Sequence, residues 1–124
     1  MANEIAASCA LSATKNSASV SATATISGTS STTMSGDQMI ANVQIIGTAA
    51  EAITVGDVST IGYVMFKNMD STNFVQLALD SGVSTQIFAK LLPGDFTIIK
   101  AATATMYAKA DTANVNLFVM AIEL

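Results

Sequence analysis

Few residue types that carry out chemistry occur in this 124-residue chain. It has no histidine and one cysteine, Cys9, which excludes a Ser-His-Asp arrangement, a Cys-His pair and the usual Cys and His zinc ligands. Asp37, Asp57 and Asp95 each follow a glycine and are candidates for paired carboxylates or, as an alternative, for calcium binding. Gly-Asp is a common turn sequence, and no stretch matches a twelve-residue calcium loop. We therefore expect a protein that is not an enzyme and that uses no metal or cofactor.

Charge is unusually sparse. The chain has five lysines and nine acids, and charged residues make up 11% of it, against about 25% in ordinary domains. The lysines are scattered singly, which argues against nucleic acid as a partner. No apolar run reaches the roughly 18 residues of a membrane span, so we expect no membrane partner. The first residues lack the features of a secretory signal, which predicts synthesis and residence in the cytoplasm.

The N-terminal residues alternate between small apolar and polar side chains. In "ASVSATATIS" (18–27) every even position is apolar and every odd one is Ser or Thr. A similar run starts at Ile5, and "KNS" (15–17) separates the two, so the pattern predicts a β-hairpin. Cys9 falls on the apolar face, where we expect it to be buried. The hairpin is interpreted as an arm that adds strands to a partner, with completion of the chain's own sandwich as the alternative.

The rest of the chain predicts a β-sandwich, plausibly a jelly-roll. Short strand-like runs recur every 8 to 12 residues between polar turns. The expected boundaries are 1–36 for the arm with a small-polar linker and 37–124 for the sandwich. The expected strands are "QMIANVQIIG", "IGYVMFKNM", "FVQLALD", "STQIFAKLL", "FTIIK", "ATMYAKA" and "VNLFVMAIEL", with "TAAEAITVGD" as an irregular connection.

Two of these strands are apolar on both faces, so we expect their outward faces to be covered by a neighbouring subunit in a homo-oligomer. Together with the arm, they supply the candidate protein-interface residues. These are Ile5, Leu11, Val20, Ile26, Val64, Phe66, Phe118 and Met120.

Three segments, "GYVMFKNMDSTNFVQLALD" (62–80), "FAKLLPGDFTIIKA" (88–101) and "MYAKADTANVNLFVMAIEL" (106–124), resemble small virion structural proteins of tailed bacteriophages. With the approach "IGTAAEAITVGDVSTIGY", the resemblance covers residues 45 to 124. It implies a role in particle assembly and no catalytic residue.

Within that group the chain is most similar to a capsid decoration, or cement, protein. The resemblance implies a virion location on the capsid surface, assembly in the host cytoplasm, the major capsid protein as partner and, by analogy, a homotrimer. A tail, head-fibre or adaptor component is the alternative. A host-surface or glycan-binding module is the second alternative, although the only large polar rings, Tyr63 and Tyr107, lie in strand-like runs where packing is expected.

Overall fold

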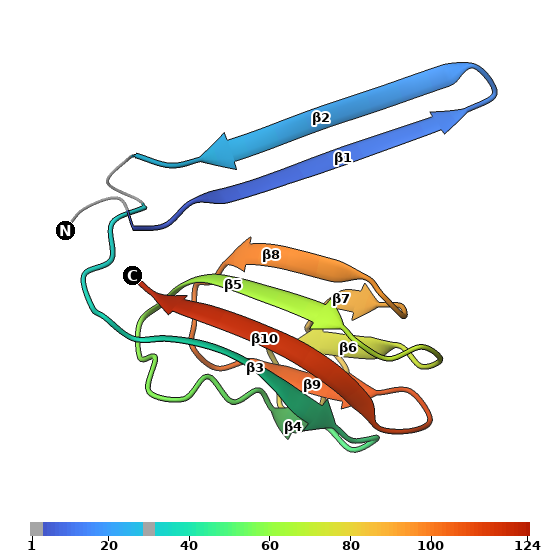
Figure 1. Cartoon of the computed structure of the whole chain (residues 1–124). Coiled ribbons are helices and arrows are strands. Elements are labelled where there is room, and N and C mark those ends of the chain that lie inside the picture. The colour runs from blue at the N-terminus through green and yellow to red at the C-terminus, as the bar shows by residue number, and fades with distance from the viewer. Residues whose placement is uncertain (1–3, 29–31) are drawn as a thin grey trace. The chain divides into compact units, whose positions relative to one another are not determined.

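The computed structural model describes residues 4–28 and 32–124. The chain divides into two compact units, Met1–Gly36 with Leu124, and Asp37–Glu123. All regular elements of the described residues are β-strands in antiparallel sheets, and no α-helix occurs among them (Figure 1). We describe the two units separately and refer to them as the arm and the eight-strand unit.

The arm contains one hairpin of two nine-residue strands, β1 (Ala7–Lys15) and β2 (Ala18–Ile26). Asn16 and Ser17 join the strands with φ of 50° and 67°. Positive φ at both central residues is the geometry of a type I′ turn, whose twist matches that of the flanking strands. The predicted hairpin and its turn are therefore confirmed.

The eight-strand unit is built from nested pairs. Its strands are β3 (Met39–Ile46), β4 (Glu51–Ala52), β5 (Ile61–Asn68), β6 (Val75–Ala78), β7 (Ile87–Leu91), β8 (Phe96–Lys100), β9 (Tyr107–Ala110) and β10 (Val115–Glu123). The outermost strands pair with each other, and the pairing continues inward: β3 pairs with β10, β4 with β9, β5 with β8, and β6 with β7. The eight-strand unit is thus one long antiparallel hairpin whose two halves are each divided into four strands.

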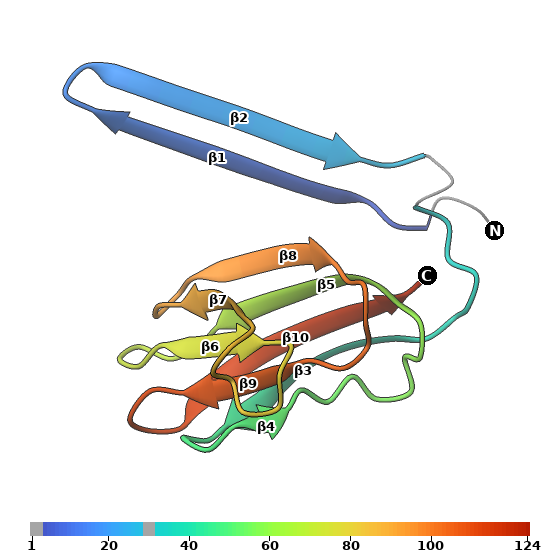
Figure 2. The same ribbon diagram turned by 180° about the vertical axis from the view of Figure 1, so that it is seen from behind.

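The eight strands form two four-stranded sheets, an arrangement consistent with a β-sandwich. Sheet I has the strand order β3-β10-β5-β8, and sheet II has the order β4-β9-β6-β7 (Figures 1 and 2). Both sheets contribute fully buried side chains to one core, including Val64, Phe66 and Leu117 from sheet I and Val75 and Leu77 from sheet II. Alternation along β10 illustrates the cause, because its odd-numbered residues from Val115 to Ala121 are buried and the intervening ones are not.

The turns at one end of the eight-strand unit converge on Asn68. Its buried amide donates to the carbonyl oxygens of Asn73 and Leu91, both at 2.9 Å, and its Oδ1 accepts from Asp70 N at 2.8 Å. Asn68 therefore ties the end of β5 to the next turn and to the end of β7. Both polar atoms of its side chain therefore have hydrogen-bond partners within the protein.

The "PGD" turn has the sequence its geometry requires. Asp95 N donates to Leu92 O at 2.9 Å, and Gly94 has φ of 84°. Proline followed by a residue with positive φ is the signature of a type II turn, and only glycine adopts that φ without strain. The Asp95 carboxylate also accepts from Leu92 N at 3.0 Å, so this Gly-Asp pair serves the turn, as expected.

Candidate interaction surfaces

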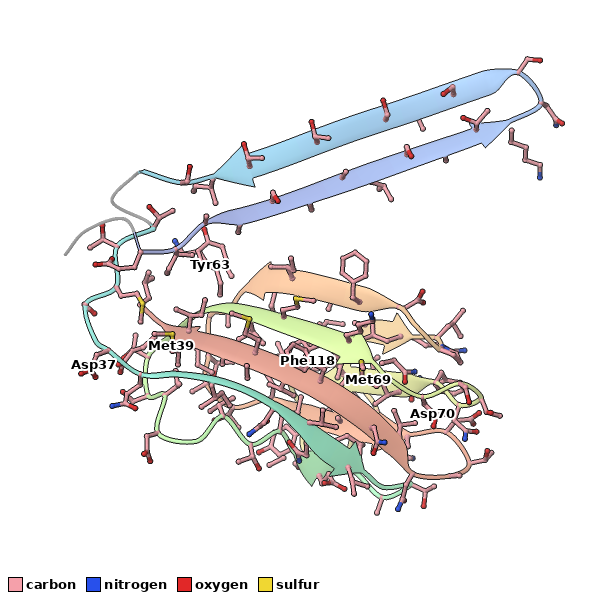
Figure 3. All side chains as sticks on the ribbon, viewed as in Figure 1. Asp37, Met39, Tyr63, Met69, Asp70 and Phe118 are labelled. Carbon is pink, nitrogen blue, oxygen red and sulfur yellow. The ribbon has the colours of Figure 1, made fainter. Side chains whose placement is uncertain are left out.

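The outward face of sheet I carries two largely apolar rows that cross all four strands. Cross-strand register aligns Ala41, Met120, Met65 and Ile98 in one row. The adjacent row contains Val43, Phe118, Lys67 and Phe96, so a single charge interrupts the two rows. We call this surface the sheet I outer face; Figure 3 labels Met39, Tyr63 and Phe118 on the strands that carry it.

Several side chains of the sheet I outer face are largely uncovered in the single chain. Ile45 is 62% exposed and Phe96 is 59% exposed, and Met39 and Val43 are comparably open. Scattered exposed apolar residues are ordinary, but neighbours that share one sheet face form a contiguous patch of the kind that marks a contact site. The surface therefore has the composition of a face that a partner covers.

The outward face of sheet II differs in chemistry. Gln76 lies opposite Lys90 on one neighbouring strand and Lys109 on the other, which produces a polar, basic row. Lys90 also places its Nζ 4.2 Å from the centroid of the Phe74 ring, a cation–π geometry that covers this aromatic ring. Sheet II therefore presents a polar row where sheet I presents two largely apolar ones.

The hairpin also has two chemically distinct faces. Register places Cys9 opposite Ala24, Leu11 opposite Ala22 and Ala13 opposite Val20 on one face, and Ser and Thr pairs dominate the other. Every residue from 8 to 25 is exposed, with Leu11 at 79% and Val20 at 71%. We call the first of these surfaces the hairpin apolar face.

The structure separates the predicted interface residues into two groups. Leu11 and Val20 lie exposed on the hairpin apolar face, and Phe118 and Met120 lie half-buried on the sheet I outer face. Val64 and Phe66, in contrast, are fully buried on the core face of β5, so their assignment to an outward face was wrong. Their strand is apolar on both sides, and the outward positions belong to the intervening residues Tyr63, Met65 and Lys67.

The three remaining assignments concern the arm. Ile5 is buried, and its N–H donates to Thr32 O at 3.0 Å; Ile26 is half-buried. Cys9 is exposed, which corrects the expectation of a buried small hydrophobe. The alternation did place it on an apolar face, opposite Ala24, but the two-stranded hairpin has no core of its own in which to bury that face.

Residues that sequence reasoning missed lie mainly on β3 and β8. Met39, Val43, Ile45 and Phe96 carry much of the exposed apolar surface of sheet I. The alternate apolar positions of "MIANVQII" were a usable signal for the first three. Which of the two faces points outward, however, depends on the pairing of β3 with β10, which the sequence did not predict.

The carboxylates of Asp70 and Asp80 accept hydrogen bonds from backbone N–H groups and so stabilise turns. Asp70 accepts from the backbone N–H groups of Asn73 and Thr72, and these hydrogen bonds lower its pKa. Asp80 is subject to desolvation, which raises its pKa, but hydrogen bonds from Gln86, Ser84 and Thr85 outweigh it and lower the pKa to about 2. Among residues 4–28 and 32–124, no group of three or more His, Cys, Asp or Glu side chains could hold a metal ion.

A small apolar pocket of about 180 Å³ lies beside β8, lined by residues that include Leu79, Phe88, Ile99 and Met106. Lys100 is its one titratable lining residue, and the Lys100 Nζ lies 5.6 Å from the centroid of the Tyr63 ring. The pocket therefore offers shape and apolar contact without an acid–base pair.

Comparison of the chain with protein-family models, with curated proteins and with solved structures finds no match. Within the described residues, no helix has the length and apolar character needed to cross a membrane.

Proposed function

We propose that this protein is a structural virion component that decorates and stabilises a phage capsid by bridging major capsid subunits. The observation that carries the proposal is that the chain exposes two extended apolar surfaces, the sheet I outer face and the hairpin apolar face. A protein that joins an assembly needs to bury surface and needs no reaction chemistry. Low charge content also favours such burial, because few ions must lose their hydration.

The strand order supports the same proposal. The eight strands form nested pairs that are split between two sheets, and this order favours a jelly-roll arrangement of the sandwich. Jelly-rolls form the domains of many viral capsid proteins, and lectins and cupins share the architecture. Among these classes, the resemblance of residues 45 to 124 to small phage virion proteins supports the virion role.

Reconstitution tests the proposal. The purified protein is mixed with empty phage heads that lack it, and the bound copies are counted and located by electron microscopy. Saturation at hundreds of copies on symmetric shell positions is the expected outcome for a decoration protein. Absence of shell binding would overturn it in favour of the tail, head-fibre or adaptor component, which is present in far fewer copies per particle.

A further inference from the structure

Two uncovered apolar surfaces on one chain raise the question of what covers each of them. We propose that the hairpin apolar face of one copy packs flat on the sheet I outer face of a second copy, and that each copy both gives its hairpin and receives its partner's. This contact concerns the protein's association with itself and does not depend on the capsid assignment.

The chemistry of the two surfaces matches. On the hairpin apolar face, the paired side chains from Ala7 and Ile26 to Ala13 and Val20 are all uncharged and apolar, and Lys15 lies at the tip beyond them. The sheet I outer face presents Met, Val, Phe and Ile with no carboxylate in its two central rows. Contact would therefore cover one charge in these rows, Lys67, and the Ser and Thr face of the hairpin would remain toward water.

The shapes of the two surfaces also match. Both hairpin strands have nine residues, and the central sheet I strands β5 and β10 have eight and nine. Small Ala side chains along the hairpin allow its backbone to approach the larger Met and Phe side chains, as when two sheets pack face to face.

The area is sufficient when the exchange is reciprocal. The face of a nine-residue hairpin measures about 30 Å by about 10 Å, which is about 300 Å². Reciprocal docking covers two hairpin faces and the two sheet faces beneath them, so a pair of copies buries about 1,200 Å² in all, the lower limit for a stable interface. One hairpin docked without return would bury only about half of that. The area therefore favours mutual exchange over a single contact.

A second copy is the occupant that these surfaces favour. Leu11 and Val20 on the hairpin, and Ile45 and Phe96 on sheet I, are all more than half exposed. A free two-stranded hairpin is marginal in water, so a stable arm needs a covering layer. A second copy supplies a surface of the right composition and length, and reciprocal docking covers the hairpin and the sheet of both copies at once.

The test uses the full-length protein and two charge-matched pairs of variants. The double variant Leu11→Asp with Val20→Asp places carboxylates on the hairpin apolar face. Its control, Ser12→Asp with Ser19→Asp, has the same diagonal cross-strand spacing on the opposite face. On sheet I, Val43→Asp is compared with Asn42→Asp, the adjacent exposed residue on the other side of β3.

Sedimentation equilibrium measures the association of each variant, and circular dichroism checks that it is folded. We expect the wild type and both controls to self-associate, and both test variants to have dissociation constants raised by more than about 100-fold, because each buries an unpaired charge. A tagged hairpin variant should bind the sheet variant more tightly than either variant binds itself, because the mixed pair keeps one of the two contacts and neither self-pair keeps any. This binding should be weaker than that of the wild type, since only half of the interface remains.

Three results would overturn the proposal. These are a wild type that stays monomeric at high concentration, control variants as defective as the test variants, and complementary variants that bind each other no more tightly than they bind themselves. Each is independent of binding to empty heads, so failure of this contact and failure of the capsid assignment are distinguishable.

Discussion

Strands β2 and β10 are both nine residues long, and in both the side chains point alternately to the two faces of the strand. The burial of those side chains, however, is very different. In β10 every second residue from Val115 to Ala121 is buried, whereas in β2 only the final residue is even partly buried. The two strands differ in side-chain volume and in what lies over them. The core-facing residues of β10 are Val, Leu and Ala, which pack in a core shared with the second sheet, and β2 carries mainly Ala, Ser and Thr, which are exposed.

This difference teaches that alternation alone specifies a strand but does not make it stable. The eight-strand unit encloses its own core and is expected to fold without help. The hairpin has the φ angles of a type I′ turn, and all nine residues of each strand are paired, but its larger apolar side chains, Leu11 and Val20, are exposed. Its stability must come from another surface, and the following predictions compare the two units.

The largest effect is expected from shortening a core leucine. Leu117→Ala should lower the free energy of unfolding by about 2–5 kcal/mol, because it removes buried methyl groups and leaves a cavity. The same change in the arm, Leu11→Ala, should leave the unfolding of the eight-strand unit unchanged, since Leu11 is 79% exposed. Urea denaturation of the dilute protein measures both. Equal losses would mean that the arm is part of the sandwich core.

The Asn68 network should produce the next largest effect. Asn68→Ala leaves the carbonyls of Asn73 and Leu91 and the N–H of Asp70 without their partner, which should cost about 2–3 kcal/mol. Asn116→Ala, at an exposed position on β10, is the matched control and should have little effect. A loss of similar size in both variants would contradict the role of Asn68. Thermal unfolding is the measurement.

Turn substitutions should act in opposite directions in the two units. Gly94→Ala forces a side chain into φ of 84° and should destabilise the eight-strand unit by about 1–2 kcal/mol. Ser17→Gly in the arm relieves a positive φ and gives the Asn-Gly sequence that type I′ turns prefer, so it should increase hairpin population. Backbone NMR chemical shifts report the hairpin, and denaturation reports the sandwich. Destabilisation by Ser17→Gly would argue against the type I′ turn.

The smallest effect is a local dependence on pH. The folded-state pKa of Asp80 is lowered from 3.8 to about 2, so its stabilising contribution is fully present above pH 3.8 and is lost as pH falls toward 2. Carboxyl chemical shifts of Asp80, followed by NMR during acid titration, should show this low midpoint. Asp80→Asn should remove the acid dependence of the 80–86 loop without affecting the hairpin. A midpoint near 3.8 would contradict the hydrogen bonds that Asp80 accepts.

Much of the fold was predictable from the sequence. The hairpin and its turn follow from alternation, and the strands β3, β5, β8 and β10 follow from short strand-like runs bounded by polar turn residues. The two-residue strand β4 fell in the segment expected to be irregular, because two residues are too few to show a period. Pairing of β3 with β10 could not be read from either strand, since it joins opposite ends of the eight-strand unit.

The candidate surfaces were predicted less completely. Alternation identified Leu11 and Val20, but on β5 both sets of alternate residues include apolar side chains, so parity could not show that Val64 and Phe66 face the core. Only the covering sheet decides between the two faces. Cys9 was misplaced for the related reason that an apolar position predicts burial only if a layer lies over it.

The nested pairing of strands has a consequence for how the protein folds. The central strands β6 and β7 are close in sequence and can pair early, whereas β3 must wait for β10, the last of the eight strands along the chain. Contacts so distant in sequence slow folding, to milliseconds or seconds in β-proteins of this kind. A growing chain therefore exposes β3 and Ile46 until β10 has been synthesised, which makes the pairing of this nine-residue strand the step that commits the eight-strand unit to its native structure.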